Sequence, residues 1–100
     1  EKKYDFVLIS VISPLLITRN LARIKFGKNY FEIYVKCKIT TLEKRDTKNL
    51  YAMAKKNIIK NLIGYNSNIK YEVSRYKKII IDTDKLSKHK STNLIIKKIF

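Results

Sequence analysis

The segment YDFVLISVI, Tyr4–Ile12, constrains the fold of this chain more than any other segment. It is rich in β-branched and aromatic residues, which favour strands, and its apolar residues are not confined to alternate positions. It therefore predicts a strand that is buried on both faces.

The apolar stretch Phe6–Ile17 is interrupted by two serines and Pro14, and it is well short of the roughly 20 residues that a membrane-spanning helix needs. The sequence therefore predicts no membrane span.

A helix and a second strand are predicted to follow. Ser13 followed by Pro14 is typical of a helix start, and apolar residues continue at helical spacing as far as Val35. The overlapping segment 31–40 alternates between apolar and polar residues, which is typical of a strand. The change from helix to strand is therefore predicted to lie between residues 27 and 36.

The second half of the chain predicts three further elements. Residues 57–68 contain the turn-like GYNSN and are predicted to surround or interrupt a strand. Apolar and polar residues alternate over Ile69–Val73, which predicts a strand. The spacing of apolar and charged residues over 76–88 allows an amphipathic helix. Apolar and cationic residues take turns over Leu94–Phe100, which predicts a last strand. The order strand, helix, strand, strand, helix, strand indicates an α+β, ferredoxin-like sandwich. Its four-stranded antiparallel sheet would carry two helices on one face, in a single domain over residues 1–100.

The charge of the chain favours a polyanionic partner. Lys and Arg number 23 against 8 Asp and Glu, which gives a formal net charge of +15. A compact domain with this excess repels itself, and a nucleic acid would neutralise it. An AT-rich genome would also raise the Lys content, but it would not by itself keep the acidic count so low. The composition therefore favours nucleic acid or another anionic surface.

Residues that carry enzyme chemistry are scarce. Cys37 has no second cysteine and no nearby His to activate it, so a buried strand position and a reducing compartment are expected. His89 lies between two lysines and has no visible orienting acid. Asp82 and Asp84 could together coordinate a metal ion. Two carboxylates near a helix N-terminus, however, commonly stabilise the helix by interacting with its dipole. With no glycine-rich phosphate loop either, the sequence predicts no enzyme, no catalytic residue, no cofactor and no metal site.

Several segments match the pattern of a known family in the same order. Residues 4–8 match an opening strand of Tyr, an acidic residue and apolar residues, and Pro14 matches a helix start. The family segment Ile-x-x-Leu-Glu-x-Trp-Gly-x-Arg-x-Leu-Ala-Tyr-Pro-Ile-Lys-Lys is matched without a gap at Ile39, Leu42, Glu43, Leu50, Lys55 and Lys56, with Lys48 at the Arg position. Arg45 and Asp46 replace the Trp-Gly pair. The chain thus resembles the bacterial-type ribosomal protein S six family, and the resemblance implies the ferredoxin-like fold and a first helix that runs to about Tyr34.

The resemblance also implies a function. The chain would be a structural constituent of the small ribosomal subunit, binding small-subunit ribosomal RNA together with ribosomal protein S eighteen and other small-subunit proteins, with no small-molecule substrate. Lys and Arg side chains would neutralise RNA phosphates, and six are candidates: Arg45, Lys48, Lys55, Lys56, Lys97 and Lys98. The absent initiator Met and the AT-biased composition favour a mitochondrial ribosome, with a plastid-type organelle or a bacterial cytoplasm as alternatives.

A stand-alone RNA-binding module is the alternative function. The segment KFGKNYFEIYV has a faint likeness to the aromatic strand of the RNA recognition motif. In such a module tyrosines stack on unpaired bases. More often a Tyr belongs to the core and keeps its hydroxyl at the surface. The tyrosines concerned are Tyr30, Tyr34, Tyr51, Tyr65, Tyr71 and Tyr76.

Overall fold

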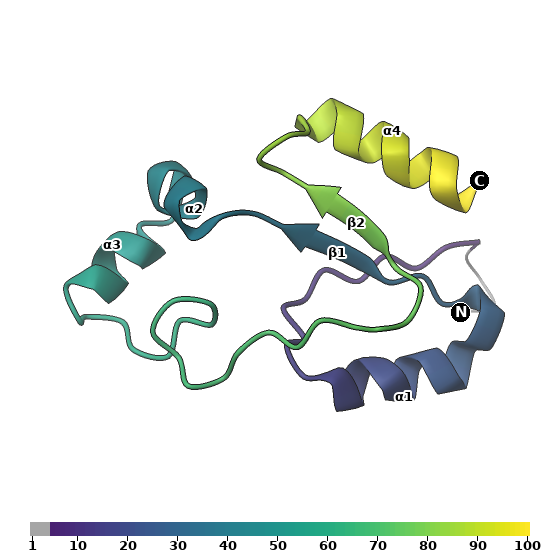
Figure 1. The fold of residues 1–100 in the computed structure, drawn as a ribbon, viewed down its shortest axis with the longest axis horizontal. Helices are drawn as coiled ribbons and strands as arrows, with labels where there is room; N and C mark the ends of the chain where they lie inside the picture. Colours follow the sequence, from purple (N-terminus) through teal and green to yellow (C-terminus); the bar gives the residue numbers. More distant parts are fainter. Residues whose placement is uncertain (1–4) are drawn as a thin grey trace.

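The computed structural model describes residues 5–100, and it contains short helices around a small sheet (Figure 1). No helix in this part of the chain is long and apolar enough to cross a membrane. In chain order the elements are α1 Leu16–Phe26, a 3-10 turn η1 Gly27–Asn29, β1 Ile33–Lys36, α2 Ile39–Arg45, α3 Leu50–Lys55, β2 Ile79–Asp82 and α4 Lys88–Ile99.

The sheet is a parallel pair, not the expected antiparallel sheet of four strands. β1 pairs with β2 in register from Ile33 opposite Ile79 to Lys36 opposite Asp82. Both strands are rich in β-branched residues, and Ile81 is the most deeply buried apolar residue, at 1% exposed. Parallel strands need a long crossover, and here it contains α2 and α3. The ferredoxin-like prediction is therefore wrong.

The first helix begins two residues later than Pro14. The α1 N-cap is Leu15, whose side chain cannot cap, and the Glu72 carboxylate instead accepts the N–H of Leu16 at 2.9 Å. The helix ends at Phe26, because Gly27 takes φ +53° and donates its N–H to the carbonyl of Arg23. The change from helix to strand falls within residues 27–36, as predicted, but a helix running to Tyr34 is wrong.

The C-terminal segment is a helix rather than a strand. The Ser87 hydroxyl caps α4 by accepting the N–H of Lys90 at 3.2 Å. The half-buried residues Leu94, Ile95 and Ile99 follow at helical spacing, and α4 packs against β2. The predicted strand Leu94–Phe100 is therefore wrong. The helix predicted over 76–88 is also wrong, since β2 and a turn occupy most of that range.

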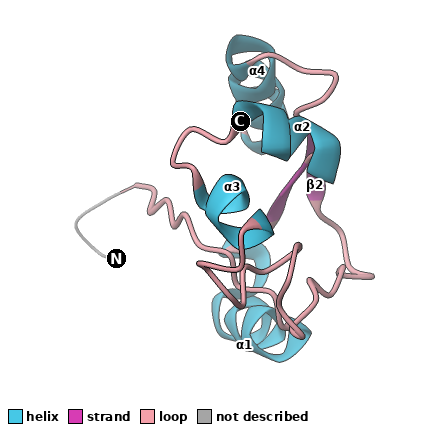
Figure 2. Ribbon diagram, turned by 90° about the vertical axis from the view of Figure 1, so that its left-hand side faces the viewer, coloured by secondary structure: helices cyan, strands magenta, loops and turns pink. Residues whose placement is uncertain are grey.

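Long stretches carry no regular structure. Residues 57–68 form turns, and Ile69–Val73, predicted as a strand, is a loop. Of the predicted strand Tyr4–Ile12, Tyr4 lies outside the described residues, and residues 5–12 pair with no other strand in the part of the chain that is described. Figures 1 and 2 show α1 and α4 at opposite ends of the molecule, with the strands between them. That residues 1–100 form a single domain stays a prediction.

Candidate functional site at the carboxyl end of the strands

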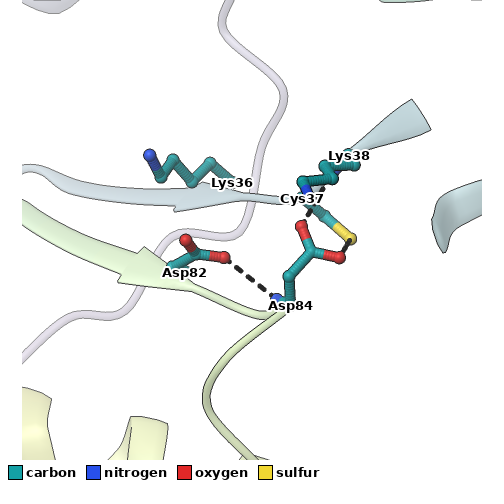
Figure 3. Close-up of a pocket in the computed structure, with 5 residues that line it drawn as sticks. All are labelled: Lys36, Cys37, Lys38, Asp82 and Asp84. Carbon is teal, nitrogen blue, oxygen red and sulfur yellow. Dashed lines mark hydrogen bonds between the residues drawn. The ribbon is translucent and has the colours of Figure 1, made fainter. Parts of the chain in front are cut away.

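The carboxyl ends of β1 and β2 lie side by side because the strands are parallel. A hollow of about 190 Å³ opens there, lined by Lys36, Cys37, Lys38, Asp82 and Asp84 (Figure 3). In open sheets with parallel strands, ligands bind in the crevice outside the carboxyl ends of the strands. The position of this hollow therefore makes it the candidate site.

Asp84 organises one wall of the hollow. Its carboxylate accepts the N–H of Lys38 at 2.8 Å, the hydroxyl of Thr41 and, at 3.7 Å, the thiol of Cys37. These bonds, the Thr41 hydroxyl first and the Lys38 N–H second, lower the pKa of Asp84 below its usual value. The ionised carboxylate thus joins the turn after β2 to the first turn of α2. The dipole role predicted for Asp82 and Asp84 concerned the helix over 76–88, which does not form, and Asp84 instead bonds the first turn of α2.

Arg45, the last residue of α2, reaches back to the same edge. Its guanidinium donates to the Thr83 carbonyl at 2.8 Å, to the Thr83 hydroxyl at 3.2 Å and to the Cys37 sulfur at 3.6 Å. These contacts fix the orientation of a planar cation that is exposed at the rim. With Lys36 and Lys38 it brings three cations to this edge, beside the two carboxylates of Asp82 and Asp84. The two lysines were missed, although both lie where an apolar strand ends.

The other five candidate cations are not gathered at this edge. Lys48 lies in the turn between α2 and α3, Lys55 ends α3 and Lys56 follows it. Lys97 and Lys98 are exposed in the last turn of α4, which Figure 1 shows on the opposite side of the molecule from α3. The structure thus brings only Arg45 of the six to the hollow. Contacts between any of the six and an anionic ligand stay a prediction.

A second hollow, of about 200 Å³, lies between α2, α3 and the following loop. Glu43, Asp46, Tyr51, Ala52, Lys55 and Tyr65 line it. The ring of Tyr51 meets that of Tyr65 edge-on, with centroids 5.7 Å apart, and the Asp46 carboxylate accepts the N–H groups of Tyr51 and Ala52, each at 3.0 Å. Burial first, and the Asp46 charge second, raise the pKa of Tyr51, so its hydroxyl stays neutral at physiological pH.

A buried polar cluster holds α1, β1 and the loop before β2 together. Arg19 donates to Glu32 at 3.3 Å and to the Ser74 hydroxyl at 2.9 Å, and Ser74 donates to Glu32 at 2.8 Å. All three residues are buried. Arg19 also lies over the ring of Tyr71, which stacks on Tyr34 with centroids 5.0 Å apart. These tyrosines pack within the protein, so they do not form the base-stacking surface of an RNA recognition motif.

Comparison with known families decides the relationship. The sequence model of the family described as Adenylylsulphate kinase matches residues 2–82. The chain belongs to the adenylylsulphate kinase family. No solved structure matches the chain.

Curated relatives carry the family name. The "Adenylyl-sulfate kinase" of Clostridium acetobutylicum is 37% identical over 89 residues, which cover 89% of this chain and 44% of the relative. The "Probable adenylyl-sulfate kinase" of Bacillus subtilis is 38% identical over 93 residues, 92% of this chain and 46% of the relative. That of Pyrococcus abyssi is 32% identical over 91 residues, 91% of this chain and 51% of the relative. The chain thus spans about half the length of these curated relatives.

Membership of the adenylylsulphate kinase family overturns the ribosomal assignment. The resemblance to ribosomal protein S six is wrong, and so is the structural role in the small ribosomal subunit. The predicted partners, ribosomal RNA and ribosomal protein S eighteen, and the predicted location in a mitochondrial ribosome are wrong for the same reason. The alternative of a stand-alone RNA-binding module is also wrong. The prediction of no enzyme and no small-molecule substrate is wrong as well, since the relatives are named as kinases of adenylyl sulfate. The matches used for the resemblance lie mostly on α2 and α3, where Lys and Leu are common residues of any helix.

Proposed function

We propose that this chain forms part of an adenylyl-sulfate kinase, which transfers a phosphoryl group from ATP to adenylyl sulfate. The observation that carries the proposal is the family match over residues 2–82. Relatives from bacteria and an archaeon bear this activity in their names.

The charge of the chain suits such substrates. ATP and adenylyl sulfate are both anions, and phosphoryl transfer depends mainly on positioning and on neutralising charge. At the strand ends the cations Lys36, Lys38 and Arg45 outnumber the carboxylates of Asp82 and Asp84 by one, and a nucleotide phosphate would pair with these cations. The net charge of +15 then serves small phosphorylated and sulfated ligands rather than RNA.

We assign Arg45 as a nucleotide contact. Its guanidinium is planar and its orientation is fixed by Thr83, so little side-chain freedom is lost when a ligand binds. Lys36 and Lys38 act as less directional charges beside it. The hollow, at about 190 Å³, is smaller than the roughly 300–1,000 Å³ of a usual ligand pocket, so these residues would form only one wall of the site.

Two parts of kinase chemistry are not assigned to these residues. The chain has only two glycines, Gly27 and Gly64, and no G-x-x-x-x-G-K-[ST] sequence that would cradle phosphates. Among residues 5–100, no three His, Cys, Asp or Glu side chains lie close enough to hold a metal ion.

Titration of the isotopically labelled chain with ATP, and separately with adenylyl sulfate, tests the proposal by NMR. We expect the largest amide shifts at residues 36–45 and 82–84, and weaker ATP binding, by about tenfold, in Arg45→Ala. Lys97→Ala is the matched control, because this exposed cation lies in the last turn of α4. Equal weakening by both variants, or shifts spread evenly over all lysines, would show that the anions bind only through the general positive charge.

A further inference from the structure

Thr83 joins the two strand ends beside the hollow shown in Figure 3. It is the first residue after β2, and its backbone N–H donates to the carbonyl of Lys36, the last residue of β1, at 3.0 Å. Its side-chain hydroxyl donates to the same carbonyl at 3.1 Å. These two bonds fix both the backbone and the side chain of Thr83, which is half-buried.

The direction of the Thr83 hydroxyl determines what it can bind next. A threonine hydroxyl has one proton to donate and two lone pairs that accept. Because the proton is donated to the Lys36 carbonyl, the lone pairs are left to accept, and the Nη1 group of Arg45 donates to the hydroxyl at 3.2 Å. The Nη2 group of the same guanidinium donates to the Thr83 carbonyl at 2.8 Å. The β-branched side chain of Thr83 is restricted at χ1, so the hydroxyl is held in place to accept from Arg45.

These bonds leave the charge of Arg45 uncompensated. Its third acceptor is the thiol sulfur of Cys37, at 3.6 Å, so none of the three acceptors is a carboxylate. Among residues 5–100, the ion pairs are those of Glu32 with Arg19 and with Arg23, and Arg45 belongs to neither. An exposed guanidinium that is held by uncharged acceptors keeps its full positive charge for a ligand.

The same bonds leave part of the Arg45 guanidinium available. A guanidinium has five N–H groups. Nη1 donates to Thr83 and to Cys37, and Nη2 donates once to Thr83, which leaves one N–H on Nη2 and the one on Nε without a bond in the described part of the chain. Two donors on neighbouring nitrogens can bind two oxygens of one phosphate group. Arg45 is therefore oriented and still able to bind an anion.

We propose that Thr83 is a positioning residue for the nucleotide, which it affects only by holding Arg45. Arg45 contacts the ligand, and Thr83 fixes the orientation in which the guanidinium meets it. Less side-chain freedom is then lost on binding than for a mobile arginine. The proposal rests on the proposed function, because it takes ATP as the ligand of Arg45. It goes further by making the affinity for ATP depend on a hydroxyl that carries no charge.

A purely structural role for these contacts makes a different prediction. Arg45 is the last residue of α2, and its bonds to Thr83 would then serve only to attach this end of the helix to the strands. Loss of the Thr83 hydroxyl would in that case weaken ATP binding equally whether or not Arg45 is present. In a positioning role, the loss weakens ATP binding only while Arg45 is present.

Nuclear spin relaxation of the arginine Nε–H groups in the isotopically labelled chain measures whether Thr83 holds Arg45. In the parent chain, we expect this group of Arg45 to be more ordered than that of Arg75, an exposed arginine in the loop before β2. Thr83→Val keeps the shape of the side chain and removes the hydroxyl, so it should lower the order of Arg45 towards that of Arg75. Thr83→Ser restores the hydroxyl and should keep Arg45 ordered.

Titration of the same variants with ATP tests the effect on binding. Thr83→Val should weaken ATP binding by about threefold to fivefold, and Thr83→Ser should stay within about twofold of the parent chain. In the Arg45→Ala background, Thr83→Val should weaken binding by less than about twofold further. Thr47→Val is the matched control, because Thr47 is exposed in the turn between α2 and α3, and it should leave the affinity unchanged within about twofold.

Three results would overturn the proposal: an Arg45 that stays equally ordered in Thr83→Val, an equal loss of ATP affinity with and without Arg45, or a loss that Thr83→Ser does not reverse. If circular dichroism shows that Thr83→Val does not fold, Thr83→Ala takes its place with the same expected results. If the parent chain binds no ATP at residues 36–45, the proposed function is refuted, and ATP is refuted as the ligand. The relaxation of Arg45 in the variants then still decides whether Thr83 positions its guanidinium.

Discussion

The Asp84 carboxylate accepts the backbone N–H of Lys38 at 2.8 Å across 46 positions of sequence. One residue lies just after β2 and the other just before α2, so this bond joins two segments that line the candidate site. The same carboxylate accepts the hydroxyl of Thr41, in the first turn of α2.

Replacing Asp84 with Asn should loosen the start of α2. The Lys38 N–H and the Thr41 hydroxyl are bound by different oxygens of the carboxylate, and the uncharged Asn amide replaces one of those oxygens with an NH₂ donor. We expect faster amide exchange at residues 38–42 and a lower melting temperature. Glu43→Gln, which neutralises an exposed carboxylate on the same helix, is the control and should change neither. Equal effects of the two substitutions would contradict a specific role for Asp84.

The Asp84 bonds also predict a pH dependence. The Thr41 hydroxyl, and then the Lys38 N–H, hold the pKa of Asp84 below its usual value of 3.8. Because the folded-state pKa is the lower one, the stabilisation by Asp84 is complete above about pH 4 and is lost as the pH falls through the folded-state pKa. Carboxyl carbon shifts should titrate with a midpoint below 3.8. A midpoint at or above that value would mean that the bonds do not persist in solution.

Replacing Arg19 with Met should destabilise the protein by about 3 kcal/mol, because it leaves the buried Glu32 carboxylate without its closest cation. Urea unfolding followed by circular dichroism measures the change. Arg75→Met is the matched control, since Arg75 is exposed in the same region of the chain, and it should change stability by less than about 0.5 kcal/mol. In combination with Glu32→Gln, the cost of Arg19→Met should shrink, since the two side chains interact directly.

Gly27→Ala should cost about 1–2 kcal/mol of stability. Gly27 has φ +53° and ψ −126°, a conformation that L-residues other than Gly rarely adopt. A methyl group at this position would meet no atom within 4 Å, so the cost comes from the backbone alone. A semisynthetic chain with D-alanine at position 27 is the control, because D-residues favour positive φ. It should be at least as stable as the parent, and a loss equal to that of L-alanine would disprove the backbone explanation.

Local patterns in the sequence predicted only local features. The alternation around Ile33–Lys36 indicated β1, and Gly27 lies at the boundary between helix and strand. In α4, the Ser87 cap and the spacing of Leu94, Ile95 and Ile99 were visible in the sequence, but the alternating apolar and cationic residues near the end favoured a strand. A run of seven residues is compatible with both periods, and tertiary packing on β2 decides between them.

The site could not be predicted because it depends on strand direction. Asp84 and Lys38 meet only because β1 and β2 are parallel, and no local pattern in Ile33–Lys36 or Ile79–Asp82 records direction. Arg45 was identified as a functional cation on the strength of its charge, yet its orientation by Thr83 arises from the same pairing. The buried Arg19 and Glu32 pair was not predicted, since nothing in the sequence distinguishes these residues from the exposed charges around them.

The parallel pairing of β1 and β2 also sets the order of events during folding. A parallel pair cannot be closed by a hairpin, so residues 37–78 must first be gathered into a loop at a large entropic cost. The backbone hydrogen bonds within helices α1 and α4 are local, so these helices can form on a microsecond timescale, well before that loop closes. Ile81 is the most deeply buried apolar residue among those described, at 1% exposed, and it is thus buried late in folding. Until β1 and β2 pair, the apolar β2 strand can associate wrongly with other chains.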